Sequence, residues 1–583
     1  MRLCSLRAVC VLVSIAATAC HQGRTSIPSG GPPTLAGIAT DGDGNPAAGA
    51  LLTATNLETG VEAETIVADG QGRFVAVLSP GNYGMAATSA SGYGWLESVR
   101  VPDTNLALGL TSTCEPLEGM VSNGSAGARI KLIRKSKFTG DTFVVPVREN
   151  GHFHACLPPA HYLASSTGDT LSMVGEIVHP GTGAVVLSGF DRRAVQTPPV
   201  AGGALDAHLE QLLVDIQRTR PGIIGLGEAS HGTAEFVTAR GQLTFELIRR
   251  MDVRLLMFEF DAMAGVALDD YVNGADIDAG KAVADLGFWT TNTVEFLAFL
   301  EQVRKYNTTA ADKVHVWGVD VQNTQRPSAV LLAGASRWSV DAEEQEILRL
   351  AAGNRGKSAL ELRPEQRARL DSLLARISAP ASAARDDLVG AVAARSLTTQ
   401  LNYWAGDMRG ELTMRRDRGM AELASFLSAR YAGSPACLWA HDAHIARDAH
   451  AAQMGHYLAA LPSWSRTPYY AVGFYLEVGT SRAWDFAGKV GVTSHPIPPA
   501  PEFGVEHVLM NASGRPAIAW IPLRDLPREL ATWLQIPRMV RELSAVYIND
   551  ADLNTLRSIR ASFDAVVIVQ HGHDTTPATG RSP

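Results

Sequence analysis

Acidic and histidine residues stand directly after four apolar runs of this chain, which end near residues 226, 258, 319 and 440. These residues are Glu228, His231, Glu259, Asp261, Asp320, His441 and His444. Histidines beside carboxylates carry out general acid–base chemistry, because histidine gains and loses its proton near neutral pH and a carboxylate makes the ring a stronger base. The pattern therefore predicts a proton-transfer site assembled from four separate segments.

The four apolar runs have the length and composition of buried strands. Runs such as Ile223-Ile-Gly-Leu are apolar throughout, which is typical of parallel strands that helices cover on both faces. Open parallel sheets bind their ligands at the carboxyl ends of the strands. We therefore expect the acids and histidines to meet in one crevice at that edge of the sheet.

Some of these residues also have a purely structural interpretation. Glu228 and His231 could cap a helix that begins near Thr233, and Asp320 could be a turn residue. The glycines that flank the first pair favour a binding site, because glycine lets the backbone turn tightly beside a ligand. A carboxylate such as Glu259, at the end of so apolar a strand, needs a partner or a role.

Other catalytic motifs do not occur in the sequence. It contains no G-x-S-x-G elbow, no phosphate-binding G-x-x-x-x-G-K-[ST] loop and no H-E-x-x-H helix. A metal site stays open, because zinc or iron accepts a ligand set such as Glu228, His231, Glu259, His441 and His444. We predict a site without a metal or cofactor and keep a metal at these five residues as the alternative.

Six motifs carry a resemblance to a known family over residues 204–570. They are Leu226–Phe236, Leu255–Asp261, Phe288–Leu297, Val316–Gln322, Arg415–Ala421 and Leu438–Arg447. In these residues and their order the chain resembles the erythromycin esterase family. One departure is Asp442, where asparagine is expected between the two histidines of the family.

The resemblance implies a carboxylic-ester hydrolase that opens a macrolide lactone without an acyl-enzyme, as in antibiotic resistance. It makes His231 the general base that activates water. It also implies that Glu228 and Glu259 orient the base or position the water.

The resemblance further implies a group that stabilises the developing oxyanion. Arg240, on the helix after the base, would do so together with one or both of His441 and His444. A macrolide is large and mostly apolar, so a wide crevice is expected. Its candidate wall residues are Trp289, Trp404 and Trp439.

Two functions of other classes remain as alternatives. One is a metal-dependent hydrolase or a transferase that acts on another substrate, and the other is a non-catalytic envelope protein that binds a ligand. The expected partner is a small-molecule ester. A formal net charge of -8 without a basic tract argues against nucleic acid. The sequence indicates no oligomeric state.

The first 33 residues predict export. Basic residues precede an apolar run that ends in Ala17-Thr18-Ala19, which is typical of a secretory signal over residues 1–19. Cys20 follows at once, so a bacterial lipoprotein in the cell envelope, attached to the membrane only through a lipid on Cys20, is predicted. Simple secretion is the alternative. Residues 20–33 are rich in Gly, Ser and Pro and predict a flexible tether.

Two small β-sandwich modules are predicted at 34–110 and 111–197, because short alternating runs are separated there by turn residues. Five matched positions at identical spacing indicate a duplication: Gly72, Phe74, Leu78, Pro80 and Tyr83 against Gly151, Phe153, Leu157, Pro159 and Tyr162. The first module resembles the carboxypeptidase regulatory-like domain. Cys114 and Cys156 could form a disulfide in an exported protein.

Apolar runs alternate with helical stretches over residues 198–575, which predicts an α/β domain with a mostly parallel sheet. The stretch at about 341–431 is rich in helix-forming residues and predicts a helical hairpin inserted at one end of the sheet. Cys437 lies inside an apolar run and is expected to be a core residue.

Overall fold

The computed structural model describes most of the chain between residues 34 and 578. The described ranges are 34–56, 62–89, 92–122, 129–134, 142–167, 171–178, 180–181, 183–191, 207–353, 362–379, 384–404, 409–431, 434–448, 453–460, 468–485, 491–502, 504–547 and 553–578. The predicted signal segment, the tether, Cys20 and the predicted boundary at residue 198 lie outside them. No described helix combines the length and apolar character that a membrane crossing requires.

The first β-rich region is a sandwich of two sheets, as predicted. Its strands are β1 (Thr34–Thr40), β2 (Leu51–Asn56), β3 (Glu62–Val67), β4 (Arg73–Val77), β5 (Gly81–Thr88), β6 (Tyr93–Val101) and β7 (Asp103–Gly109). One sheet has the order β4-β1-β7 and the other β3-β2-β5-β6. Inward-facing side chains such as Leu35, Phe74 and Tyr83 form its buried core.

The second β-rich region repeats this strand order. Its strands are β8 (Glu115–Ser122), β9 (Arg129–Arg134), β10 (Thr142–Pro146), β11 (His152–Leu157), β12 (Tyr162–Thr167), β13 (Leu171–Val178) and β14 (Val185–Asp191). Their order contains β10-β9-β12-β13 and β14-β8-β11, which match the two sheets of the first region strand for strand. The parallel pair β1–β7 corresponds to the parallel pair β8–β14. The second region differs in that β13 and β14 pair and join the two sheets.

The duplication predicted from the sequence extends to individual side chains. Tyr83 donates its hydroxyl to the carbonyl oxygen of Ser79 at 3.0 Å, and Tyr162 donates to that of Pro158 at 2.9 Å. Both bonds span four residues, and both tyrosines are buried. The matched motifs therefore mark one repeated turn in front of β5 and β12.

A disulfide joins Cys114 and Cys156, whose Cα atoms lie 5.3 Å apart. This separation is in the normal range for a disulfide. The bond ties the start of the second β-rich region to β11, 42 residues later in the chain. The pairing that the sequence left open is thus present.

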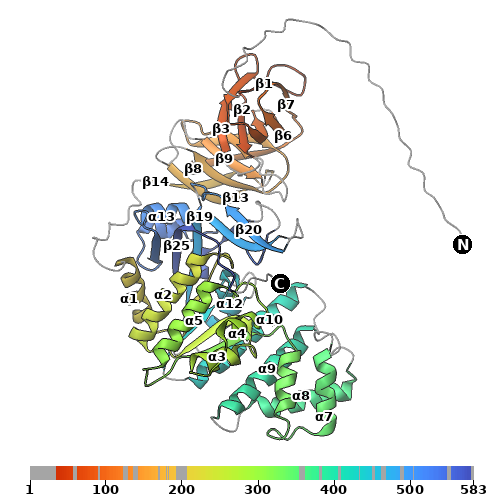
Figure 1. The fold of residues 1–583 in the computed structure, drawn as a ribbon. Coiled ribbons are helices and arrows are strands. Elements are labelled where there is room, and N and C mark those ends of the chain that lie inside the picture. The colour runs from red at the N-terminus through yellow and green to blue at the C-terminus, as the bar shows by residue number, and fades with distance from the viewer. Residues whose placement is uncertain are drawn as a thin grey trace, which may run out of the picture.

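The α/β region is built on one mostly parallel sheet (Figure 1). Its path is β17 (His315–Asp320), β16 (Leu255–Asp261), β18 (Ala436–Trp439), β15 (Ile223–Leu226), β19 (Tyr469–Asp485), β25 (Ala565–Gly572) and β21 (Ile518–Pro522). The first six strands are parallel to their neighbours, and β21 is antiparallel to β25. The short strands β15 and β18 are buried at every position, as expected for strands covered on both faces.

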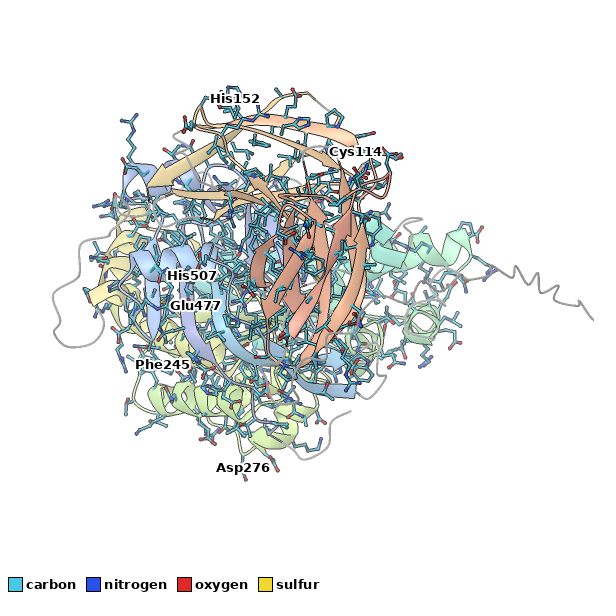
Figure 2. The ribbon with its side chains drawn as sticks, turned by 90° about the horizontal axis from the view of Figure 1, so that it is seen from above. Cys114, His152, Phe245, Asp276, Glu477 and His507 are labelled. Carbon is cyan, nitrogen blue, oxygen red and sulfur yellow. A yellow bond between two sulfur atoms is a disulfide. The ribbon has the colours of Figure 1, made fainter. Side chains whose placement is uncertain are left out.

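Two further strands extend this sheet, and two others form a separate two-stranded sheet. Strands β20 (Gly491–Ile497) and β23 (Val546–Tyr547) pair with β19, and β22 (Arg538–Arg541) pairs with β24 (Asn554–Arg557). Glu477 of β19 lies 3.3 Å from the Nδ1 atom of His507 on α13 (Val505–Ala512), which joins that helix to the sheet (Figure 2).

Helices connect the strands and cover the sheet. Outside the insert they are α1 (Ala207–Thr219), α2 (Ala234–Met251), α3 (Gly265–Val272), α4 (Ala279–Ala284), α5 (Val294–Asn307), α6 (Gln325–Ala333), α11 (Asp442–Ile445), α12 (Met454–Ala460), α13, α14 (Arg528–Trp533) and α15 (Ile559–Ser562). The insert contains α7 (Ala342–Ala352), α8 (Pro364–Ser378), α9 (Arg385–Trp404) and α10 (Arg409–Arg430). Helices α7, α8 and α9 lie together at one end of the molecule, and α10 leads back toward the sheet (Figure 1).

Candidate active site

A cavity of about 410 Å³ lies where β15, β16 and β18 end. This volume is in the range of sites that bind small molecules. The six residues proposed from the sequence all line the cavity: Glu228, His231, Arg240, Glu259, His441 and His444. The ends of these three strands, which lie up to about two hundred residues apart in the chain, thus meet at one edge of the sheet.

Glu228 and His231 lie in the turn between β15 and α2. The Nδ1 atom of His231 lies 2.9 Å from Oε1 of Glu228. Since a carboxylate oxygen can only accept, Nδ1 carries the proton and the lone pair of the ring is on Nε2. Arg240, which lies on the following helix α2, donates to the other oxygen of Glu228. We call Arg240, Glu228 and His231 the His231 set.

Arg240 is held in a buried position by two further contacts. Its Nε donates to the carbonyl oxygen of Phe236 at 3.3 Å, and its guanidinium lies 4.7 Å from the ring centroid of Trp439. A cation over an indole face is stabilised when both groups are shielded from water. Because the guanidinium is already bound to Glu228, its place in this structure is that of a support for the carboxylate.

His441 caps the short helix α11 through its side chain. Its Nδ1 accepts a hydrogen bond from the backbone N–H of Ala443 at 3.1 Å, so a neutral ring carries its proton on Nε2. That Nε2 atom is buried and has no hydrogen-bond partner among the described residues. Burial holds the pKa of His441 well below its usual value, and a positive charge on His231 acts in the same direction when that ring is protonated. The two rings are 4.9 Å apart, centroid to centroid.

Glu259, His444 and Arg416 form a second set, which we call the His444 set. Oε1 of Glu259 lies 3.1 Å from Nε2 of His444 and 3.0 Å from NH2 of Arg416. Its other oxygen accepts the backbone N–H of His441 at 2.9 Å. Burial acts to raise the pKa of Glu259, but the positive charges of His444 and Arg416 outweigh it and hold this pKa well below its usual value.

His444 lies between two carboxylates. Its Nδ1 is 2.6 Å from Oδ1 of Asp417, and its Nε2 faces Glu259. NH1 of Arg416 also lies 3.1 Å from Nε2, but the two carboxylates favour a charged ring with protons on both nitrogens. Burial acts to lower the pKa of His444, whereas Glu259 and Asp417 raise it to about 10.

Asp320 reaches the site through Arg416. Its two oxygens accept from Nε and NH2 of Arg416 at 3.0 and 2.9 Å, a paired arrangement that fixes the plane of the guanidinium. Asp320 also accepts from the backbone N–H of Val321 and from Gln322. The strand-end carboxylate is thus both a turn residue and a partner of the site. By contrast, Asp261 accepts from the backbone of the following turn and does not line the cavity.

Arg416 and Asp417 have no role predicted from the sequence, although both belong to the motif Arg415–Ala421. Both are on α10, which returns from the helical insert to the sheet. Their neighbour Arg418 is exposed and pairs with Glu422 four residues later. Four charged residues in a row on a helix do not indicate which of them faces the sheet, so the sequence signal was insufficient.

Asp442, where asparagine was expected, is completely buried beneath the two histidines of its loop. Its carboxyl accepts from the backbone N–H of Phe474 at 3.2 and 3.3 Å. Burial raises the pKa of Asp442 well above its usual value, and the charge of Glu542 adds to this effect. A protonated carboxyl has nearly the shape of an asparagine side chain, with one donor and one acceptor, which accounts for aspartate at this position.

The walls of the cavity are largely aromatic. They include two of the predicted tryptophans, Trp289 and Trp439, together with Phe258, Phe288 and Phe296. The side chain of Trp404 lies outside the described part of the structure. Cys437 is buried in the core, and burial raises the pKa of its thiol to about 12, so this thiol stays protonated.

A metal at the five predicted ligands would compete with protein groups. Within the described residues, no three His, Cys, Asp or Glu side chains are arranged to hold a metal ion. Nδ1 of His231 is bound to a carboxylate, Nδ1 of His441 accepts from the backbone, and His444 faces a carboxylate on each side. A bound metal would therefore have to displace at least one of these partners.

A mostly parallel sheet with paired histidines and carboxylates in a cavity at its carboxyl edge has the features of an α/β enzyme. Residues 248–572 match the model of the family described as erythromycin esterase, and the chain belongs to this family. The predicted family is thereby confirmed, and membership makes the protein a hydrolase of the esterase type. The matched range contains the His444 set and His441, whereas the His231 set precedes it.

Solved structures similar to this chain have low sequence identity to it. A succinoglycan biosynthesis protein superimposes with a TM-score of 0.55 at 17% identity, over 66% of this chain and 96% of that protein. A protein from Bacillus cereus gives 0.54 at 17% identity, over 66% and 97%. A variant of the erythromycin esterase EreC in its open conformation gives 0.48 at 19% identity, over 64% and 96%. No curated protein sequence matches the chain.

Proposed function

We propose that this protein hydrolyses a carboxylic ester by direct attack of water, with His231 as the general base. The observation that carries the proposal is the Glu228–His231 pair in an aromatic cavity, beside the Nε2 of His441, which has no hydrogen-bond partner in the described part of the chain. One ring can accept a proton there, and the other can donate a hydrogen bond to the same reacting group.

The base works through the free nitrogen of His231. As the water oxygen bonds to the ester carbonyl carbon, its proton passes to Nε2, and Glu228 stabilises the charged ring at Nδ1. When the tetrahedral intermediate collapses, the bond to the leaving oxygen breaks and that oxygen takes the proton from Nε2. Water and ester thus become acid and alcohol, without an acyl-enzyme. Positioned general-base catalysis contributes roughly 10²- to 10⁴-fold in rate.

His441 is the donor that we assign to the oxyanion. A neutral ring with its Nδ1 bound to the backbone presents an Nε2–H, and burial in the cavity leaves this group for the substrate. A preorganised donor of this kind contributes on the order of 3 kcal/mol to the stability of the transition state. Glu259 supports His441, because it accepts its backbone N–H.

The two arginines receive supporting roles in this proposal. Arg240 was expected at the oxyanion, but its bond to Glu228 favours a role in fixing the base. Arg416 and His444 keep Glu259 ionised, and His444 contributes positive charge at the cavity wall.

The substrate that we propose is a bulky, largely apolar ester, with a macrolide lactone as the candidate. The support is the aromatic wall, which can cover apolar surface while a few polar groups orient the ester. Export is proposed with it. The Cys114–Cys156 disulfide supports export, because disulfides persist in oxidising compartments.

Mass spectrometry of erythromycin and of smaller lactones, incubated with the full chain, tests this function. Wild type should add one water to a substrate, and His231→Gln should not. His154→Gln is the matched control, because His154 also pairs with a glutamate but is in the second β-rich region. Equal hydrolysis by wild type and His231→Gln would remove His231 from the mechanism. Activity lost to a chelator and restored by zinc or iron would favour the metal alternative.

A further inference from the structure

The last described residues, 573–578, run across the N-termini of two helices that flank the cavity. We call these residues the C-terminal strap. Helix α2 follows the loop that carries His231, and α5 follows the loop that carries Trp289. Both residues line the cavity, and their rings meet edge to face with centroids 6.5 Å apart.

At α2 the backbone of His573 and Thr575 in the strap makes three hydrogen bonds. Its carbonyl oxygen accepts the N–H of Ala234 at 2.9 Å, and its N–H donates to Oε2 of Glu235 at 2.7 Å. Two residues later, the N–H of Thr575 donates to the carbonyl oxygen of Gly232 at 2.8 Å.

The same three contacts recur at α5, three strap residues further on. The carbonyl oxygen of Thr576 accepts the N–H of Val294 at 2.8 Å, and its N–H donates to both oxygens of Glu295 at 3.1 Å. Two residues later, the N–H of Ala578 donates to the carbonyl oxygen of Asn292 at 3.2 Å. The strap therefore binds both helices by one repeated scheme.

A short sequence repeat explains why the scheme can recur. Both helices begin with T-x-E-F, at Thr233–Phe236 and at Thr293–Phe296. In each, threonine precedes the first helical residue and the phenylalanine is buried. Isolated β-bridges join the two threonines to Asp574 and Pro577, again three residues apart.

Physical chemistry favours this arrangement at a helix N-terminus. The first N–H groups of a helix have no partner within the helix, so a strap carbonyl can satisfy one of them. Thr233 makes no side-chain cap for α2, because its hydroxyl bonds to Ser230 and Ser481. The strap therefore supplies an acceptor at this end of the helix. The glutamates of the first turn accept the N–H groups of the strap, at a position where the helix dipole favours negative charge.

We propose that the C-terminal strap is a positioning element of the active site, which fixes the loop of His231 against the loop of Trp289. Glu235 and Glu295 are its positioning residues. The inference rests on the proposed function, because it takes this cavity as the reactive site. The strap follows residue 572, where the match to the family model ends.

Loss of the hydrogen bonds between the strap and one helix should displace the loop before that helix, while the residues that line the cavity remain unchanged. A displacement of about 1 Å at a reacting group can lower the rate by up to about 10²-fold. The Trp289 loop forms part of the cavity wall and does not carry the base. Releasing α5 from the strap should therefore change KM as well as kcat.

The experiment compares Glu295→Ala, Glu295→Gln and Glu365→Ala in the full chain. Glu365 is the matched control, since it holds the same second helical position on α8, away from the cavity. Amide hydrogen exchange of residues 288–294 is measured together with kcat and KM for an ester that the wild type hydrolyses. Glu295→Ala should speed exchange there and lower kcat/KM by about tenfold. Glu295→Gln, which keeps a hydrogen-bond acceptor, should retain most of the wild-type kcat/KM.

Unchanged exchange and unchanged kinetics in Glu295→Ala would overturn the proposal. If that variant does not fold, Thr576→Pro removes the same hydrogen bond from the strap side and takes its place. If the wild type hydrolyses no ester, the proposed function fails, but faster exchange of residues 288–294 still decides whether the strap fixes the cavity wall.

Discussion

The His231 set and the His444 set contain the same three residue types but differ in the carboxylates around the histidine. His231 contacts one carboxylate, that of Glu228, and keeps a free ring nitrogen. His444 contacts two, those of Glu259 and Asp417, which occupy both nitrogens and keep the ring charged. Only the first histidine can therefore accept a proton. The number of carboxylates, and not the residue type, therefore distinguishes the base from the cation here.

The largest effect is expected from removing the base. His231→Gln should lower kcat/KM by about 10²- to 10⁴-fold, because the proton acceptor is lost. His444→Gln should cost less, because the base and its carboxylate remain. Steady-state kinetics of both variants measure the difference. The comparison breaks down if His444→Gln is the more damaged of the two while both remain folded.

A second large effect is expected from Arg416→Ala, measured by chemical denaturation. The side chain is mostly buried and serves the carboxylates of Glu259 and Asp320. Loss of one partner from a buried ion pair typically destabilises a protein by about 3–5 kcal/mol. Arg418→Ala, two residues away on the exposed side of α10, should cost about 0–1 kcal/mol. Similar losses in both variants would show that the His444 set does not depend on Arg416.

His441 and His444 should make the stability of the protein depend on pH in opposite directions. The pKa of His444 is raised to about 10, so its contribution to stability is complete below about pH 6.5 and is lost as the pH rises through about 10. The pKa of His441 is lowered, so its contribution is present above about pH 6.5 and is lost as the pH falls through the lowered pKa. Denaturation curves from pH 5 to 10 measure both slopes. His444→Gln should abolish the alkaline slope, and His441→Gln the acidic one.

The smallest effect is expected from Asp442→Asn, between the two histidines. The raised pKa of Asp442 means that ionisation opposes folding as the pH rises above about 4, the ordinary value of aspartate. The amide cannot ionise, so the variant should be more stable than wild type at pH 7 by about 1 kcal/mol or more and should keep its activity. The gain should vanish below about pH 4. A loss of stability at pH 7 would mean that the carboxylate is ionised in the fold.

The sheet, the strand ends and the residues that meet there could be predicted from the amino-acid sequence. Apolar runs of strand length followed by acids and histidines were sufficient, because parallel strands present their carboxyl ends at one edge. Spacing alone also revealed the duplication of the β-rich regions, since Gly72 and Tyr83 recur as Gly151 and Tyr162. In each case the information is local and periodic, and it can be read along the chain.

Only the tertiary structure decided how these residues divide the work. Contacts between distant segments set the direction of Arg416 from α10, the sharing of His444 between two carboxylates and the burial of His441 Nε2 in the cavity. The strap depends on them as well, because residues 573–578 meet two helices that begin roughly three hundred residues earlier. Burial and charge at a site are set by everything packed around it, and no local pattern contains that information.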